Sequence, residues 1–150
     1  MLRRKRNKIL LWVILLGLAN FAAYTLMYWY LQGDASNGKF QDGRYYLRGH
    51  FIRHLAGQES EPVSRTTWLY SYAHSITIWP TIAAVLVSMV ILARPHIIAT
   101  ISSDSLVSGH TFVIVFITVV VFLTAASTLY FVMNFVNALS VIAQGKPYGV

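Results

Sequence analysis

Three of the five histidines have positions that could bind a metal ion or a haem. His50 and His54 are four residues apart, so on a helix they would lie on one face. His74 follows at the beginning of a long apolar stretch and could reach the same level. Imidazole is a common ligand of zinc, copper and iron. The alternative is that all three are polar side chains at a membrane surface. We favour this alternative, so we expect no cofactor.

The remaining sequence contains no recognisable catalytic motif. It has no Gly-rich phosphate loop, dinucleotide fingerprint, nucleophile elbow or zinc-protease motif. It also lacks cysteine, which excludes disulfides, thiol nucleophiles and cysteine-bound metals. Its long apolar stretches carry no charged side chain, whereas pumps and proton relays usually have one inside the membrane. These observations predict a protein that is not an enzyme.

A run rich in arginine and tyrosine is the strongest candidate for a recognition surface. It comprises Arg44, Tyr45, Tyr46 and Arg48. Arginine and tyrosine are both enriched at binding hot spots. Leu47, within the run, begins a series of apolar residues at steps of four that extends to residue 55. This spacing predicts a short amphipathic helix lying on lipid headgroups or on a protein partner.

Three stretches without Asp, Glu, Lys or Arg dominate the chain, and each is long enough to cross a membrane. They cover residues 9–31, 66–93 and 105–145. A spanning helix needs about 20 predominantly apolar residues. In lipid, a helix satisfies all of its backbone polar groups internally. The sequence therefore predicts an all-α polytopic membrane protein, with three transmembrane helices in a single domain of 150 residues.

The neighbouring charged and aromatic residues set the expected boundaries. We place the first span at residues 9–31, an external loop at 32–65 and the second span at 68–93. The third stretch is longer than one span requires, which leaves two interpretations. Either one long helix extends from residue 110 to 143, or the span ends near residue 134 and a separate short segment follows.

Two polar features of the spans predict contacts between helices. The second span carries a stripe of small residues, namely Thr77, Thr81, Ala84 and Ser88. Helices in lipid associate through close packing and polar bonds, because lipid supplies no hydrophobic drive. We therefore expect this stripe to contact another helix. By the same argument Asn20, at the middle of the first span, should face protein rather than lipid.

The basic residues predict how the chain is oriented. Five of the twelve Lys and Arg residues precede residue 9. Such clusters stay on the cytoplasmic side, where they also meet anionic lipid. We expect the N-terminus in the cytoplasm and the C-terminus outside, in an inner membrane of bacterial type. Because the charge is concentrated beside a span, we do not expect nucleic-acid binding.

These features together favour a non-enzymatic accessory subunit of a multi-subunit inner-membrane complex. Such a subunit would bind and stabilise a larger integral membrane protein while lying in the lipid bilayer. Two alternatives remain open. One is a redox subunit that holds a haem or metal at His50, His54 and His74. The other is a self-assembling channel or a membrane-embedded immunity or exclusion protein, which would form a homo-oligomer.

The expected topology is tested by placing single cysteines in this naturally cysteine-free chain. A cysteine at Ser36 should react with a membrane-impermeant thiol reagent in intact cells, because the first loop is expected outside. A cysteine at Ser103 should react only after the membrane is opened. The opposite labelling pattern would contradict the orientation.

Overall fold

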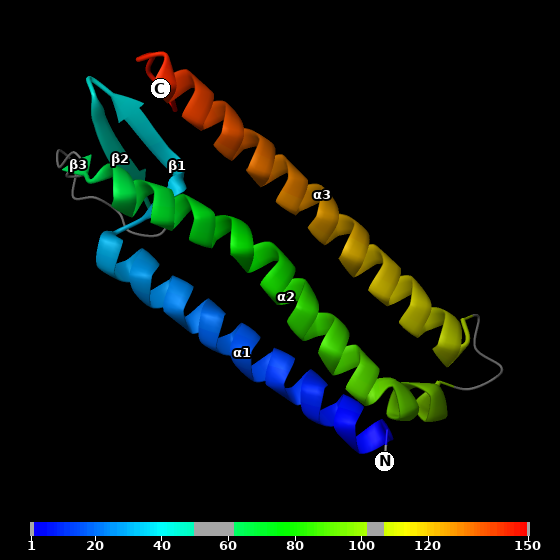
Figure 1. The fold of residues 1–150 in the computed structure, drawn as a ribbon. Coiled ribbons are helices and arrows are strands. Elements are labelled where there is room, and N and C mark those ends of the chain that lie inside the picture. Colours follow the sequence, from blue (N-terminus) through cyan, green and yellow to red (C-terminus); the bar gives the residue numbers. More distant parts are fainter. Residues whose placement is uncertain (1, 50–61, 102–106, 150) are drawn as a thin grey trace. The chain divides into compact units, whose positions relative to one another are not determined.

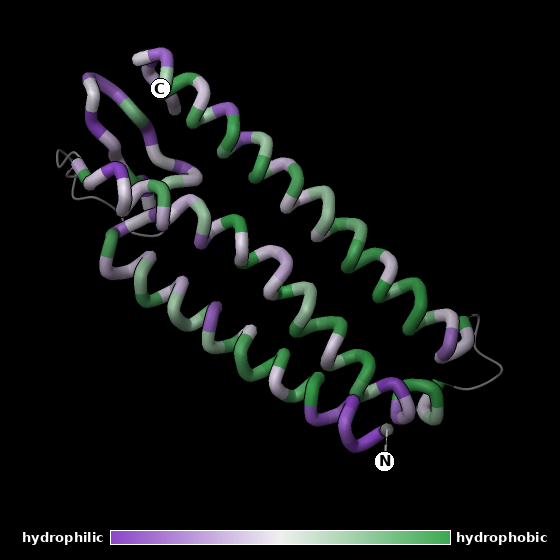
Figure 2. The backbone as a smooth tube through the Cα atoms, viewed as in Figure 1, coloured by the Kyte–Doolittle hydropathy of each residue, from purple (hydrophilic) through white to green (hydrophobic). Residues whose placement is uncertain are grey.

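The protein, described here by a computed structural model, consists of three long helices and a small sheet. The structure describes residues 2–49, 62–101 and 107–149. In chain order the elements are α1 (Leu2–Leu31), β1 (Asp34–Gln41), β2 (Arg44–Arg48), β3 (Pro62–Val63), α2 (Arg65–Thr100) and α3 (Gly109–Ala143) (Figure 1). All three helices are long and apolar enough to cross a membrane, as expected. Figure 2 shows hydrophobic residues along much of each helix and hydrophilic residues at the N-terminus and in the hairpin.

The expectation of an all-α chain is wrong in the first loop. Strands β1, β2 and β3 form an antiparallel sheet in that order. Residues 44–48 form β2 rather than the beginning of an amphipathic helix, and residues 50–55 of that expected helix lie outside the described residues. The reason is the turn between Gln41 and Arg44. Asp42 and Gly43 both have positive φ angles, of 52° and 74°, which suits a tight hairpin turn.

The helices extend beyond their expected ends. Helix α1 begins at Leu2 instead of residue 9, and α2 continues through Pro95 to Thr100. Helix α3 is continuous from Gly109 to Ala143. The third apolar stretch therefore forms one long helix, and no separate segment follows residue 134.

The chain divides into two compact units, and each long helix contributes to both. The helical unit comprises Met1–Phe21 and Trp79–Ser127. The sheet unit comprises Ala22–Ile78 and Thr128–Val150. The sheet is therefore packed with the C-terminal end of α1, the N-terminal end of α2 and the C-terminal end of α3.

The core of the sheet unit lies between the sheet and the two helices α2 and α3. Its buried residues are Ala35, Leu47, Trp68, Tyr72 and Ala138. Trp68 is fully buried, and its ring centroid lies 5.2 Å from that of Tyr72 and 5.6 Å from that of Tyr45 on β2. Burying an aromatic ring this completely is a large stabilising contribution. Trp68 thus joins the hairpin to α2.

The C-terminal part of α3 completes this core. Ala138 is fully buried, and the ring of Phe135 lies 4.8 Å from that of Tyr72. With 35 residues α3 is about 52 Å long, whereas the hydrocarbon layer is about 30 Å thick. Part of its length is therefore available for packing on the sheet. Beyond the helix, Tyr148 and Phe40 exchange two backbone hydrogen bonds of 2.9 Å each, which pair the chain with the edge of β1.

In the helical unit, α1 and α2 approach each other closely at Gly17. A Cβ atom at Gly17 would clash with the side chain of Val85 and would lie 3.4 Å from Cγ2 of Thr81. One turn further along α1, the Asn20 amide donates a hydrogen bond of 3.0 Å to the Thr81 hydroxyl. The expectation that Asn20 faces protein is thus confirmed. This contact has the two features that hold helices together in lipid, a small residue and a polar bond.

Replacing Trp68 by alanine should destabilise the sheet unit strongly. The change removes a fully buried ring, and such truncations cost about 3–5 kcal/mol of unfolding free energy. Denaturant unfolding in detergent, followed by circular dichroism, would measure the loss. Trp29→Ala is the matched control, because the Trp29 side chain is 74% exposed. Equal stability of the two variants would contradict the role of Trp68.

Candidate functional site

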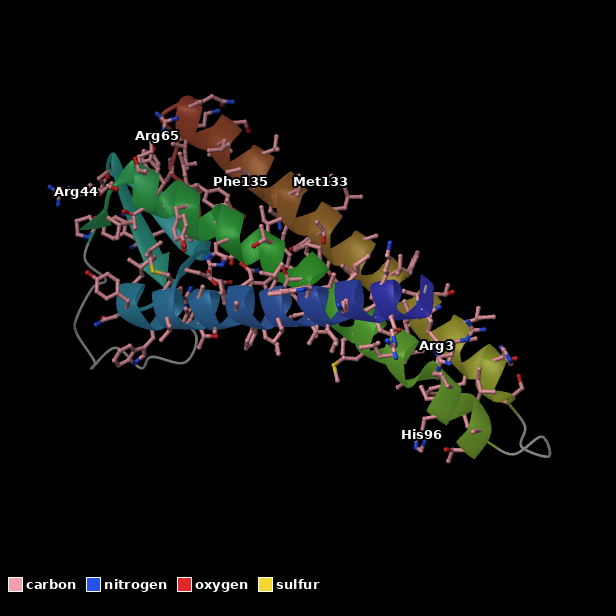
Figure 3. The ribbon with its side chains drawn as sticks, turned by 60° about the horizontal axis from the view of Figure 1, so that its bottom comes forward. Arg3, Arg44, Arg65, His96, Met133 and Phe135 are labelled. Atoms are coloured by element: carbon pink, nitrogen blue, oxygen red, sulfur yellow. The ribbon has the colours of Figure 1, made fainter. Side chains whose placement is uncertain are left out.

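The hairpin directs its basic residues to the face opposite the core. Along β2, Leu47 is 2% exposed and Tyr45 packs on Trp68, so these two side chains point inward. Because successive side chains of a strand alternate between faces, Arg44, Tyr46 and Arg48 belong to the other face. Both arginines are exposed, and Arg44 extends away from the ribbon in Figure 3. Of the four expected recognition residues, Tyr45 is therefore half-buried on the core side of the hairpin.

Strand β1 adds two polar residues to the same face. Lys39 is paired with Tyr46, and Gln41 is paired with Arg44. The Lys39 ammonium lies 5.2 Å from the centroid of the Tyr46 ring and donates a hydrogen bond of 3.1 Å to the side-chain carbonyl of Gln41. We call this surface the basic face, which consists of Lys39, Gln41, Arg44, Tyr46 and Arg48. It holds three cations, and among the described residues the carboxylate paired with it is that of Asp34, which is the register partner of Arg48 and is buried.

The basic face is suited to binding anionic groups. Arginine presents a planar fork of N–H donors that binds a carboxylate through two parallel hydrogen bonds. Residues four apart on a strand are about 13 Å apart, so Arg44 and Arg48 can reach separate acidic groups. The backbone beneath is fixed by the ladder of β1 and by the core. Binding therefore requires little additional ordering of the chain.

The hairpin is attached to α1 by a buried carboxylate that sequence reasoning missed. Asp34 is 5% exposed. Its Oδ2 accepts a hydrogen bond of 2.9 Å from the Tyr24 hydroxyl. Its Oδ1 accepts bonds from the Ser36 hydroxyl at 2.8 Å and from the backbone N–H and side-chain amide of Asn37, both at 3.1 Å. These four neutral donors compensate for the loss of water around the charge.

A second bond anchors the beginning of β1 to α2. The backbone N–H of Ala35 donates to the hydroxyl of Ser71 at 3.1 Å, and both residues are buried. The Asp34 and Ala35 contacts thus fix β1 to two helices. A short-range signal for Asp34 was available, since Asp often accepts bonds from backbone N–H groups two or three residues later. The hydrogen bond between Asp34 and Tyr24 could not be predicted, because Tyr24 lies within α1 and Asp34 follows the end of that helix.

The alternative haem or metal site lies only partly within the described residues. His50 and His54 lie outside them. The ring centroid of His74 lies 5.4 Å from that of Tyr24 and 5.5 Å from that of Tyr70, with both pairs edge to face. The pocket beside His74 and Asp34 has a volume of about 10 Å³, which is room for one water molecule at most. The described parts of the chain contain no group of three residues placed to hold a metal ion.

Within this chain, the small residues of α2 do not all contact another helix. Thr81 bonds to Asn20, and Ser88 is buried. Thr77 and Ala84 are exposed instead. Helix α1 contacts α2 through Thr81 and Val85, so the contact face lies beside the expected stripe and only partly overlaps it. The exposed Ala84 is therefore no part of this contact.

Changing Asp34 to asparagine should loosen β1. An amide NH₂ group would replace one carboxylate oxygen and would face hydrogen-bond donors, and an unsatisfied buried group costs about 1–3 kcal/mol. Amide hydrogen exchange of residues 34–41 should become faster, and the unfolding free energy should fall by that amount. Asp42→Asn is the matched control, because Asp42 is an exposed turn residue and asparagine tolerates its positive φ. Equal exchange in both variants would contradict the anchoring role.

Comparisons with known proteins give no further assignment. No protein-family model matches the chain, and neither curated proteins nor solved structures give a significant match. The basic face and its supports are therefore the basis on which a function is argued.

Proposed function

We propose that this chain is a non-enzymatic accessory subunit of a multi-subunit complex in an inner membrane of bacterial type. In this role it binds and stabilises a larger integral membrane protein. The observation that carries the proposal is the basic face of the hairpin, where Lys39, Arg44 and Arg48 surround Tyr46. Three helices apolar enough to span a membrane support the location.

The chemistry of the basic face specifies the complementary surface on the partner. Three cations on a face whose paired carboxylate, Asp34, is buried among other hydrogen bonds favour a partner segment rich in Asp or Glu. Tyr46 offers an amphipathic ring at the centre of the face, and such rings are frequent at binding hot spots. An acidic loop or helix end of a membrane protein has both the charge and the location required.

The attachment of the hairpin supports a binding role. Arg44 and Arg48 lie on a strand whose opposite side packs into the core through Leu47. The bonds of Asp34 and Ala35 hold the neighbouring strand to α1 and α2. A recognition surface fixed in this way loses little conformational entropy when a partner binds. The basic residues before residue 9 favour a hairpin on the outer side of the membrane.

The test reverses the charge of the basic face and measures which membrane proteins co-purify in mild detergent. The double variant R44E/R48E should reduce recovery of the partner by at least about tenfold, since removing one side of a close charge pair costs about 2–5 kcal/mol. Quantitative mass spectrometry of the purified complex would measure the change. Lysine substitutions in the acidic segment of the recovered partner should restore binding to the double variant.

The control R65E/K146E makes the same change in net charge at two exposed residues of the sheet unit that are not on the basic face. It should leave recovery of the partner unchanged. If the two double variants lose the partner equally, general charge rather than the basic face is responsible. If neither loses it, the proposed binding surface is wrong.

A further inference from the structure

An open pocket in the helical unit combines three arginines with an apolar lining. Its volume is about 360 Å³, and it is lined by Arg3, Arg6, Ile91, Arg94, Pro95 and Ile98. We call it the arginine pocket. None of its lining residues, all of which the structure describes, is acidic. The pocket belongs to the helical unit and shares no residue with the basic face.

The spacing of these residues explains why they converge. Arg3 and Arg6 are three residues apart on α1, so they lie on the same face of that helix. On α2, Ile91, Arg94 and Ile98 follow the same periodicity, at steps of three and four. Two helix faces that each carry arginine thus line one pocket. Figure 3 shows Arg3 at the beginning of α1.

A contact from the third helix positions one of the arginines. The Nη2 atom of Arg94 lies 3.4 Å from Nδ1 of His110, in the first turn of α3. Because a guanidinium group has no acceptor, Arg94 donates this hydrogen bond and Nδ1 of His110 accepts it. The backbone of α3 also comes close to α2 here, because a Cβ atom at Gly109 would lie 2.8 Å from Cα of Ile98. Residues of all three helices therefore fix the environment of Arg94.

We propose that the arginine pocket binds the headgroup of an anionic phospholipid. The three guanidinium groups donate hydrogen bonds to the lipid phosphate, for which the arginine fork is well matched. Ile91, Pro95 and Ile98 pack against the glycerol and the first acyl carbons. A free phosphate ion would leave this apolar lining unused. Basic pockets between membrane helices commonly bind such headgroups.

The position of the pocket along the chain agrees with a lipid ligand. Arg3 and Arg6 lie a few residues before the uncharged part of α1, which begins after Lys8, and Arg94 immediately follows the uncharged part of α2. Charged residues beside apolar spans lie at the level of the lipid headgroups. The guanidinium groups and the phosphate layer are therefore at the same depth.

The experiment titrates delipidated full-length protein in detergent with phosphatidylglycerol and follows bound lipid by native mass spectrometry. Wild-type protein should bind phosphatidylglycerol at least about tenfold more tightly than the zwitterionic phosphatidylcholine. The variant R3Q/R6Q/R94Q should bind phosphatidylglycerol at least about tenfold more weakly than R4Q/K5Q/K8Q. This second variant removes three basic residues of α1 that do not line the pocket. Circular dichroism would confirm that both variants remain helical.

Two results would overturn the proposal. Equal weakening in the two triple variants would mean that diffuse charge, and not the pocket, holds the lipid. Displacement of phosphatidylglycerol by glycerol 3-phosphate or inorganic phosphate at equal concentrations would mean that the site recognises phosphate alone. A lipid site instead retains phosphatidylglycerol against both soluble competitors, because neither can occupy the apolar lining.

Discussion

Burial of Trp68 is the interaction on which the organisation of the sheet unit depends. The centroid of its ring lies 5.6 Å from that of Tyr45 on β2 and 5.2 Å from that of Tyr72 on α2. A three-stranded sheet with one two-residue strand has little stability of its own. The apolar contacts around Trp68 supply the stability that the few hydrogen bonds between these short strands cannot provide. These contacts also determine which way the basic face points. A shift of β2 by one residue would turn Tyr45 and Leu47 away from the Trp68 ring and the arginines toward it.

Polar contacts refine an arrangement that apolar packing establishes. Asp34 accepts four hydrogen bonds and fixes the path of the chain where it leaves α1. The hydroxyl of Ser71 accepts a further hydrogen bond from the backbone N–H of Ala35. In the helical unit the comparable contact is the single bond between Asn20 and Thr81, beside the close approach at Gly17. Packing against lipid would satisfy neither side chain of that pair. The two units thus use the same combination of a tight contact and a satisfied polar group.

The helices were predictable, and the hairpin was only partly so. The absence of charge over long stretches dictates helices in lipid, and all three form. Around Arg44 two periodicities compete, because Leu47 fits both a helical step of four and a strand step of two. The adjacent Asp42 and Gly43 decide for the strand, since their positive φ angles return the chain onto β1. Tyr45 was assigned to a recognition surface because its strand register was unknown, and Asp34 was missed because Tyr24 reaches it only in the folded chain.

The contribution of α3 to the core has a consequence for the order of biosynthesis. A chain is made from its N-terminus, so the hairpin and α2 emerge before Ala138 and Tyr148 exist. Until then, the side of Trp68 and Tyr72 that α3 covers is open, and the edge of β1 has no pairing with Tyr148. Completion of the sheet unit is therefore coupled to insertion of the last helix. A nascent chain stalled before α3 would expose aromatic surface, the kind of surface that chaperones and quality-control proteases recognise.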